Sequence, residues 1–201
     1  GAMLLQAEHL SINFGSRQLL TDVNFYLNEG DKVGIIGING TGKSTFLKVL
    51  AGALEADEGK IVRSPNAQIS YLSQNPLMED EATIIEQIFL HFPKEFRELN
   101  EYEAKSMLTR LGFTVFSQKV GTLSGGQRKR VALVAALVHP ADILILDEPT
   151  NHLDSEMVAW LEDWLRSFRG GLIMVTHDRY FLERVVNHIT ELSRGKIYHY
   201  E

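Results

Sequence analysis

The segment from Gly37 to Thr45 has the residue types and spacing of a loop that binds phosphate. It reads Gly37-Ile38-Asn39-Gly40-Thr41-Gly42-Lys43-Ser44-Thr45 and matches the pattern G-x-x-x-x-G-K-[ST]. Glycines let the backbone curl so that amide groups point at phosphate oxygens, and a following helix adds its dipole. We expect Lys43 to reach the β- and γ-phosphates, Ser44 to ligate Mg²⁺, and Thr45 to donate a further hydrogen bond. A chance match in a Gly-rich turn is the alternative, which the strand–loop–helix context disfavours.

Two carboxylates, Asp147 and Glu148, directly follow the apolar run 143–146. Ligands of open α/β sheets bind at the carboxyl ends of strands, so this pair is expected beside the phosphate loop. Asp147 is expected to face a metal ion, directly or through water. Glu148 is expected to polarise an attacking water as a general base. An acidic strand end that only caps the next turn is the alternative, and the phosphate loop argues against it.

A second loop, Leu123-Ser124-Gly125-Gly126-Gln127, opens another expected helix. Its amides and the Ser124 hydroxyl at a helix N-terminus would form a further anion site. One nucleotide does not need two such loops from the same chain. The second loop is therefore expected to serve a nucleotide held by another copy.

The elements that must position these loops alternate between strands and helices. The sequence predicts strands at 4–14, 19–27, 32–36, 61–62, 68–72, 143–146, 172–176, 189–193 and 196–200, and helices at 43–51, 124–138, 155–168 and 178–187. A charged helical stretch, 79–111, is interrupted at Pro93, and its acidic residues 79–81 are expected at a helix N-terminus. The wholly apolar run 143–146 indicates a parallel sheet. The fold class is therefore α/β, a mixed β core with an antiparallel β subdomain and a small helical subdomain over about 75–139.

The helix predicted at 155–168 carries an apolar stripe at helical spacing. Its members are Trp160, Leu161, Trp164, Leu165 and Phe168. We interpret them as core residues rather than as a base-stacking platform.

Composition excludes several classes of protein. The 201 residues are 44% hydrophobic and 23% charged, which argues against disorder. The net charge of −6 does not suggest a nucleic-acid binder, although it leaves room for a local basic patch. The chain has no cysteine, which excludes disulfides and thiol catalysis, and no apolar run long enough to span a bilayer. We expect a cytoplasmic protein without direct membrane insertion, with residues 1–3 as a tag remnant and 4–201 as one domain.

The order of these motifs resembles that of the ABC ATPases. The phosphate loop, Gln74, LSGGQ (123–127), LILDEP (144–149), Asn-His-Leu-Asp (151–154) and His177 follow one another with fitting spacings. The resemblance covers essentially the whole chain. It implies the ABC type of P-loop NTPase fold, with ATP and Mg²⁺ as cofactors.

The resemblance also implies roles for single residues. Phe14 would stack on adenine, although a lone Phe on a strand is more often core. Gln74 would touch Mg²⁺ and the attacking water, and His177 would contact the γ-phosphate instead of being a surface or capping residue. Asp154 would lie at the seam between two domains. The residues that would contact the partner's nucleotide are Ser124, Gly125, Gly126 and Gln127. Each site would need a second ABC domain, so an isolated domain would bind nucleotide but hydrolyse it weakly.

Two segments point to one branch of this family. Thr-Asn-His-Leu-Asp (150–154) and Thr-His-Asp-Arg-Tyr-Phe-Leu (176–182) resemble the ABC-F family, and the ending 192–198 resembles its Uup type. That resemblance implies a soluble protein with two ATPase domains that acts on the ribosome and its RNA, in translation regulation or antibiotic resistance. The chain would then be the N-terminal domain, and 75–122 is too short for a long coiled-coil arm. An ATP-binding subunit of a membrane ABC transporter is the alternative, and a bare ATP-binding module is a third.

Overall fold

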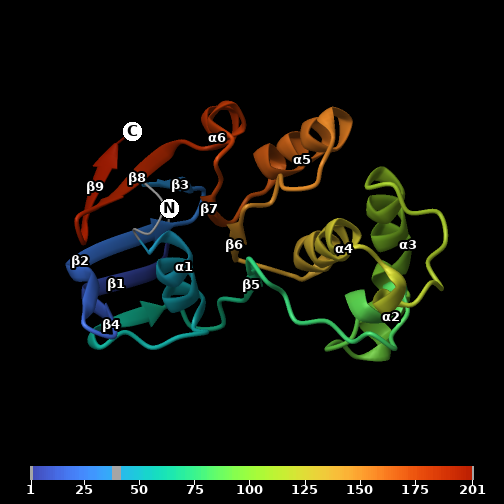
Figure 1. The fold of residues 1–201 in the computed structure, drawn as a ribbon, viewed down its shortest axis with the longest axis horizontal. Helices are drawn as coiled ribbons and strands as arrows, with labels where there is room; N and C mark the ends of the chain where they lie inside the picture. Colours follow the sequence, from blue (N-terminus) through green and yellow to red (C-terminus); the bar gives the residue numbers. More distant parts are fainter. Residues whose placement is uncertain (1, 38–41, 201) are drawn as a thin grey trace.

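A six-stranded sheet forms the centre of the molecule (Figure 1). The computed structural model describes residues 2–37 and 42–200, with the backbone alone at Phe14. The strand order is β5 (Ile69–Leu72), β6 (Ile143–Asp147), β7 (Gly171–Val175), β3 (Lys32–Ile36), β8 (His188–Ser193), β9 (Lys196–Tyr200). All neighbouring pairs are parallel except β8 and β9. Every residue of β6 and β7 is buried, which explains their uninterrupted apolar runs.

A second, antiparallel sheet covers one face of the first. Its order is β2 (Arg17–Asn28), β1 (Met3–Phe14), β4 (Glu58–Arg63). Helix α1 (Lys43–Ala51) shares one apolar cluster with both sheets, and Phe46 of the helix meets Phe25 of β2 edge to face at 5.6 Å between ring centroids. The predicted helix 43–51 is confirmed, and Gly52 ends it in a left-handed conformation with φ of 84°.

The remaining helices lie against the other face of the central sheet. They are α2 (Ile84–Ile88), α3 (Lys94–Arg110), α4 (Gly125–Val138), α5 (Ser155–Ser167) and α6 (Arg179–Val185), with a 3₁₀ turn at Val120–Thr122. Figure 1 shows α2, α3 and α4 grouped on the opposite side of β5 and β6 from α1. On α5, Leu161 and Leu165 are fully buried and three aromatic side chains pack beside them, so the prediction of an apolar core stripe is confirmed. The α/β fold class is also confirmed.

The acidic residues at 79–81 do not lie at a helix N-terminus, so that prediction is wrong. Helix α2 begins only at Ile84, where Thr83 caps it in a reciprocal capping box with Glu86. Asp80 instead accepts a hydrogen bond from Arg128 Nη1 at 2.8 Å, and Glu81 pairs with Lys119 Nζ at 2.8 Å. Long-range partners in the helical subdomain therefore position these carboxylates.

Candidate functional site

The phosphate-loop motif lies between a strand, β3, and a helix, α1, which is the context that such a loop requires. Gly42, in a left-handed conformation with φ of 87°, is the N-cap of α1, and the Lys43 ammonium donates a hydrogen bond to the Gly37 carbonyl. Thr45 is half-buried in the first turn of α1. Asn39, Gly40 and Thr41, which the motif also implicates, lie outside the described residues, as does the side chain of Phe14.

Lys43 faces the two carboxylates that follow the apolar strand β6. Burial lowers the pKa of Lys43, and the charges of Glu148 and Asp147 oppose that effect. The phosphate loop follows β3, and the carboxylates end or follow β6, two strands away in the same sheet. The carboxyl ends of parallel strands meet at one edge, so these three groups gather where α/β proteins bind ligands.

Asp147 is a buried carboxylate whose charge is not compensated by a hydrogen bond. Asp147 is 3% exposed, and within the described part of the chain neither of its carboxylate oxygens has a hydrogen-bond partner. Burial raises the pKa of Asp147, and the nearby Ser44 hydroxyl offsets part of that rise. Such an oxygen pair is suited to a cation, which would supply the missing charge and coordination.

Ser44 and Gln74 lie beside this carboxylate. The Ser44 hydroxyl, in the first turn of α1, donates to Gln74 Oε1 at 3.4 Å, and Gln74 follows β5. Three oxygen donors, from α1, the end of β5 and the end of β6, therefore come together. Each is an oxygen of the kind that Mg²⁺ prefers.

Glu148 adopts a backbone conformation that is rare for a residue with a side chain. Its φ is 54°, in the left-handed region, and its amide donates to the Val175 carbonyl at 2.7 Å. The His177 amide donates to Glu148 Oε2 at 3.1 Å, and His177 Nδ1 contacts Oε1. The carboxylate side chain is 6% exposed and the imidazole 68%, so the histidine forms the solvent side of this pair. Two expected catalytic residues are thus in direct contact.

Three residues to which the motif analysis gave no separate role, Thr150, Thr176 and Asp178, hold this region together. The Thr150 and Thr176 hydroxyls lie 3.3 Å apart, and Thr176 Oγ1 also accepts from the Asp178 amide at 3.1 Å. Asp178 then caps α6 by accepting from the Phe181 amide at 3.0 Å. The signal available in the sequence was a Thr and an Asp on either side of His177 at a strand end.

The second loop lies apart from the phosphate loop of its own chain. Ser124 and Gln127 form a reciprocal capping box, with amide-to-oxygen distances of 2.9 and 3.2 Å, at the exposed start of α4. A Cβ at Gly126 would lie 3.1 Å from His152 Nδ1, so this glycine admits the histidine. Asp154 is exposed and caps α5 through the Met157 amide at 3.0 Å. In Figure 1, β5 and β6 separate α4 from α1.

Replacing Asp147 by Asn is expected to stabilise the chain when metal and nucleotide are absent. A neutral amide would replace a buried carboxylate that has no hydrogen-bond partner among the described residues, so the free energy of unfolding should rise by about 1–3 kcal/mol. Urea unfolding in EDTA measures this change, and the exposed Asp163→Asn is the control. In Mg²⁺ and ATP the variant should gain less stability than the parent chain. A loss of stability in EDTA would contradict the description of Asp147 as a buried carboxylate without a hydrogen-bond partner.

This sheet topology, with a phosphate-loop motif after β3 and a carboxylate pair at the end of β6, defines an ABC-type ATPase domain. The chain belongs to the ABC transporter family, whose family model matches residues 20–151. Throughout the described ranges, no helix has the length and apolar character that a bilayer span requires.

Curated bacterial relatives match nearly the whole chain. An uncharacterised ABC transporter ATP-binding protein of Bacillus subtilis, YfmR, is 39% identical over 98% of this chain and 37% of its own length. The ATP-binding protein Uup of Buchnera aphidicola is 36% identical over 96% of this chain and 33% of its own. The energy-dependent translational throttle protein EttA of Escherichia coli is 34% identical over 90% of this chain and 39% of its own length. The chain thus spans little more than a third of these relatives.

Solved structures share the fold. An ATP-binding subunit of an ABC transporter superposes with a TM-score of 0.84 at 25% identity, covering 96% of this chain and 88% of that one. A dimeric ATP-binding cassette in a post-hydrolysis state, bound to ADP and phosphate, also gives 0.84, at 23% identity and 98% coverage of both chains. The latter likeness concerns the fold alone.

Proposed function

We propose that the chain binds Mg²⁺ and ATP at the carboxyl ends of β3, β5 and β6 and hydrolyses the nucleotide. The observation that carries this proposal is the cluster of Lys43, Asp147 and Glu148 at the end of one parallel sheet. Mg²⁺ in such sites uses one or two carboxylates together with substrate phosphates. This suits the described residues, among which no group of three or more carboxylate or imidazole side chains could hold a metal alone.

Each member of the cluster has a proposed role. Ser44, Gln74 and Asp147 would hold the ion, which would neutralise phosphate charge when bound. Lys43 would contact the β- and γ-phosphates. Glu148, oriented by its contacts with His177, would accept a proton from the attacking water. The other residues proposed to surround the nucleotide are Phe14, Gly37, Asn39, Gly40, Thr41, Gly42 and Thr45.

A second ABC domain would complete each site. Ser124, Gly125, Gly126, Gln127 and Asp154 are proposed to contact a nucleotide held by that domain. The start of α4, which is exposed, capped and separated from α1 by β5 and β6, supports this division. The fold shared with a dimeric cassette supports it as well.

For the whole protein we propose a cytoplasmic ABC-F factor that carries two such domains and acts on the ribosome. The chain's share of its relatives, 33–39%, leaves room for a second domain and a linker. One relative is named a translational throttle, and the segment 150–154 resembles the corresponding segment of the ABC-F family. The alignment with YfmR spans 235 positions, so that relative carries residues with no counterpart in these 201.

Co-sedimentation with ribosomes tests this proposal. The full-length protein carrying Glu148→Gln should pellet with ribosomes through a sucrose cushion in ATP, at least several-fold more than in ADP. Trapping the nucleotide should hold the two domains together in the form that binds. The same full-length protein with Lys43→Met, deprived of ATP, is the control. Recovery in the supernatant under all conditions would contradict a ribosomal role.

An ATP-binding subunit of a membrane transporter is the second candidate. An apolar groove of about 320 Å³ favours it, lined by residues of β5, α2 and α4, with Leu77 at its edge 98% exposed. A short helix from a membrane domain would fit such a groove. Recovery of the full-length protein with membranes, and its release by Leu77→Ser, would support this candidate.

A further inference from the structure

A basic hollow lies at the end of the central sheet opposite the nucleotide site. It has a volume of about 700 Å³, and its cationic side chains are Lys32, Arg166, Arg169 and Arg184. Lys32 begins β3, Arg166 lies in the last turn of α5, and Arg169 lies two residues before β7. The phosphate loop follows the other end of β3, about 16 Å away for a strand of five residues. The hollow is therefore a separate feature.

Three segments of the chain bring positive charge to this hollow. The Lys32 ammonium donates to the Arg166 carbonyl at 2.6 Å, and burial, then the Arg166 charge, lowers the pKa of Lys32. Arg184 is held in a bidentate pair with Glu162, at 2.6 and 3.0 Å. Arg169 is exposed and forms no ion pair with any residue that the structure describes.

Positive charge dominates the lining of the hollow. Among the described residues that line it, Glu29 is the one carboxylate, against four cations. Glu162 compensates Arg184 and lies 3.8 Å from Arg166. Lys32 and Arg169 have no comparable partner in the described chain. A bound anion would relieve the repulsion between Lys32 and Arg166, and the planar guanidinium group binds phosphate oxygens in a bidentate geometry.

A smaller hollow of about 210 Å³ adjoins the basic one and is lined by tyrosines. The two meet at the β2–β3 turn, where Gly30 and Lys32 line the first and Asp31 the second, and at the start of β8. Tyr26 and Tyr200 line this tyrosine hollow and are 46% and 50% exposed. Cationic groups next to exposed aromatic rings are typical of surfaces that bind single-stranded nucleic acid.

We propose that the basic hollow and the tyrosine hollow together bind a single-stranded segment of RNA. Backbone phosphates would occupy the basic hollow, and a base would stack on Tyr26 or Tyr200. The proposal rests on the proposed function only in that a ribosome would supply the RNA. Arg184 is already fixed by Glu162, so Arg166 and Arg169 are the side chains best suited to contact phosphates.

Fluorescence anisotropy with a labelled 20-nucleotide RNA tests the phosphate contacts. The double variant Arg166→Gln/Arg169→Gln should bind about tenfold more weakly in 50 mM salt, and the slope of log K against log salt should fall by about 1.4. The matched control is Lys60→Gln/Arg110→Gln, which removes two exposed charges from β4 and α3. It should change neither quantity appreciably.

A second variant tests the stacking contact separately. Tyr200→Leu should weaken RNA binding about tenfold without changing the salt slope, because stacking releases no counterions. The control is Tyr102→Leu on α3, where the tyrosine is 87% exposed. Binding of an ATP analogue should be unchanged in both variants, which shows that the domain remains folded.

Several results would overturn the proposal. They are absence of RNA binding by the chain, equal loss of binding in test and control variants, displacement of RNA by millimolar inorganic phosphate, and preference for anionic phosphatidylglycerol vesicles.

Ribosome sedimentation separates this inference from the proposed function. If full-length Glu148→Gln pellets with ribosomes equally well with and without Arg166→Gln/Arg169→Gln, the RNA site is wrong and the ribosomal role stands. If full-length Glu148→Gln never pellets with ribosomes, but the substituted chains lose RNA binding as expected, the ribosomal role is wrong and the RNA site stands.

Discussion

Replacing Glu148 by Gln is expected to lower the ATP turnover of this domain by a factor of about 10² to 10⁴ while ATP still binds. Glutamine keeps the shape of the side chain, and its oxygen can accept the hydrogen bond from the His177 amide, but it cannot take a proton from water. The amide replaces a carboxylate that is 6% exposed and in contact with His177. The chemistry should fail, and the architecture of the site should remain.

Phosphate release measures the turnover, and fluorescent ATP measures binding. Rates should be taken at several chain concentrations, because the proposed site needs a second domain. Glu95→Gln, an exposed residue in the first turn of α3, is the matched control and should retain full turnover. Unchanged turnover in Glu148→Gln would show that another group accepts the proton.

The sequence was sufficient to predict which strand ends carry the candidate site. Lys43, Asp147 and Glu148 follow apolar runs that become β3 and β6, and parallel strands bring such ends to one edge. The contact between Glu148 and His177 was beyond prediction, because it depends on the register that pairs Asp147 with Val175 and on a left-handed φ at Glu148. No local sequence pattern indicates the register, and none indicates a left-handed φ at a residue other than glycine.

Long-range partners also explain the one helix start that was wrong. The charged run at 79–81 has the composition of a helix N-terminus, yet Arg128 and Lys119, far along the chain, pair with two of its carboxylates. The basic hollow has the same origin. Its four cations come from three separate segments, so neither the net charge of −6 nor any local run of basic residues revealed it.

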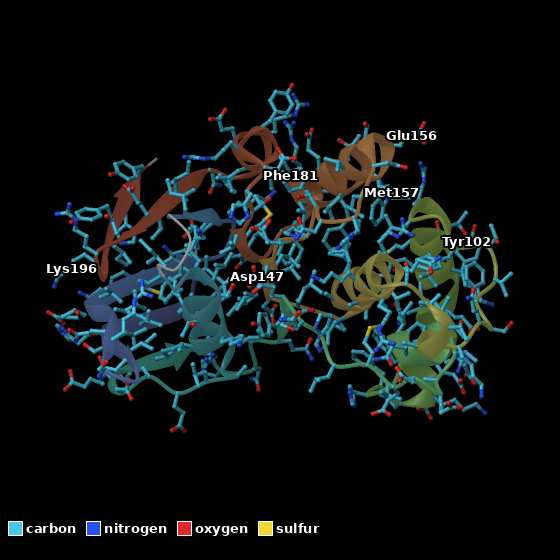
Figure 2. All side chains as sticks on the ribbon, in the orientation of Figure 1. Tyr102, Asp147, Glu156, Met157, Phe181 and Lys196 are labelled. Atoms are coloured by element: carbon cyan, nitrogen blue, oxygen red, sulfur yellow. The ribbon has the colours of Figure 1, made fainter. Side chains whose placement is uncertain are left out.

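Whether a residue lies at the carboxyl or the amino ends of the central strands is expected to determine whether its substitution affects ATP or RNA. Figure 2 shows Asp147 at the centre of the molecule, with Lys196 and Tyr102 at opposite sides of it. Substitutions at the carboxyl ends of the strands should affect ATP binding or turnover and leave RNA binding intact. Substitutions at the amino ends should do the reverse. This separation makes the phosphate-loop lysine a test of the first site alone.

Replacing Lys43 by Met is expected to weaken ATP binding by about 10- to 100-fold, since a charge-assisted hydrogen bond contributes roughly 1.5–3 kcal/mol. Methionine keeps an unbranched apolar stem and removes the ammonium. In the structure that ammonium donates to the Gly37 carbonyl and faces Asp147 and Glu148, so its removal also leaves two carboxylates less compensated.

The matched control is Lys48→Met, which removes the same charge from an exposed position on the same helix. Titration with fluorescent ATP should give a dissociation constant near that of the parent chain for the control and a much higher one for Lys43→Met. The effect should persist at high salt, because Lys43 is partly buried and its contact with phosphate would be local, whereas a long-range attraction would be screened. Equal weakening in the two variants, or its disappearance in salt, would mean that α1 attracts ATP only through its general charge and that Lys43 does not bind the phosphates.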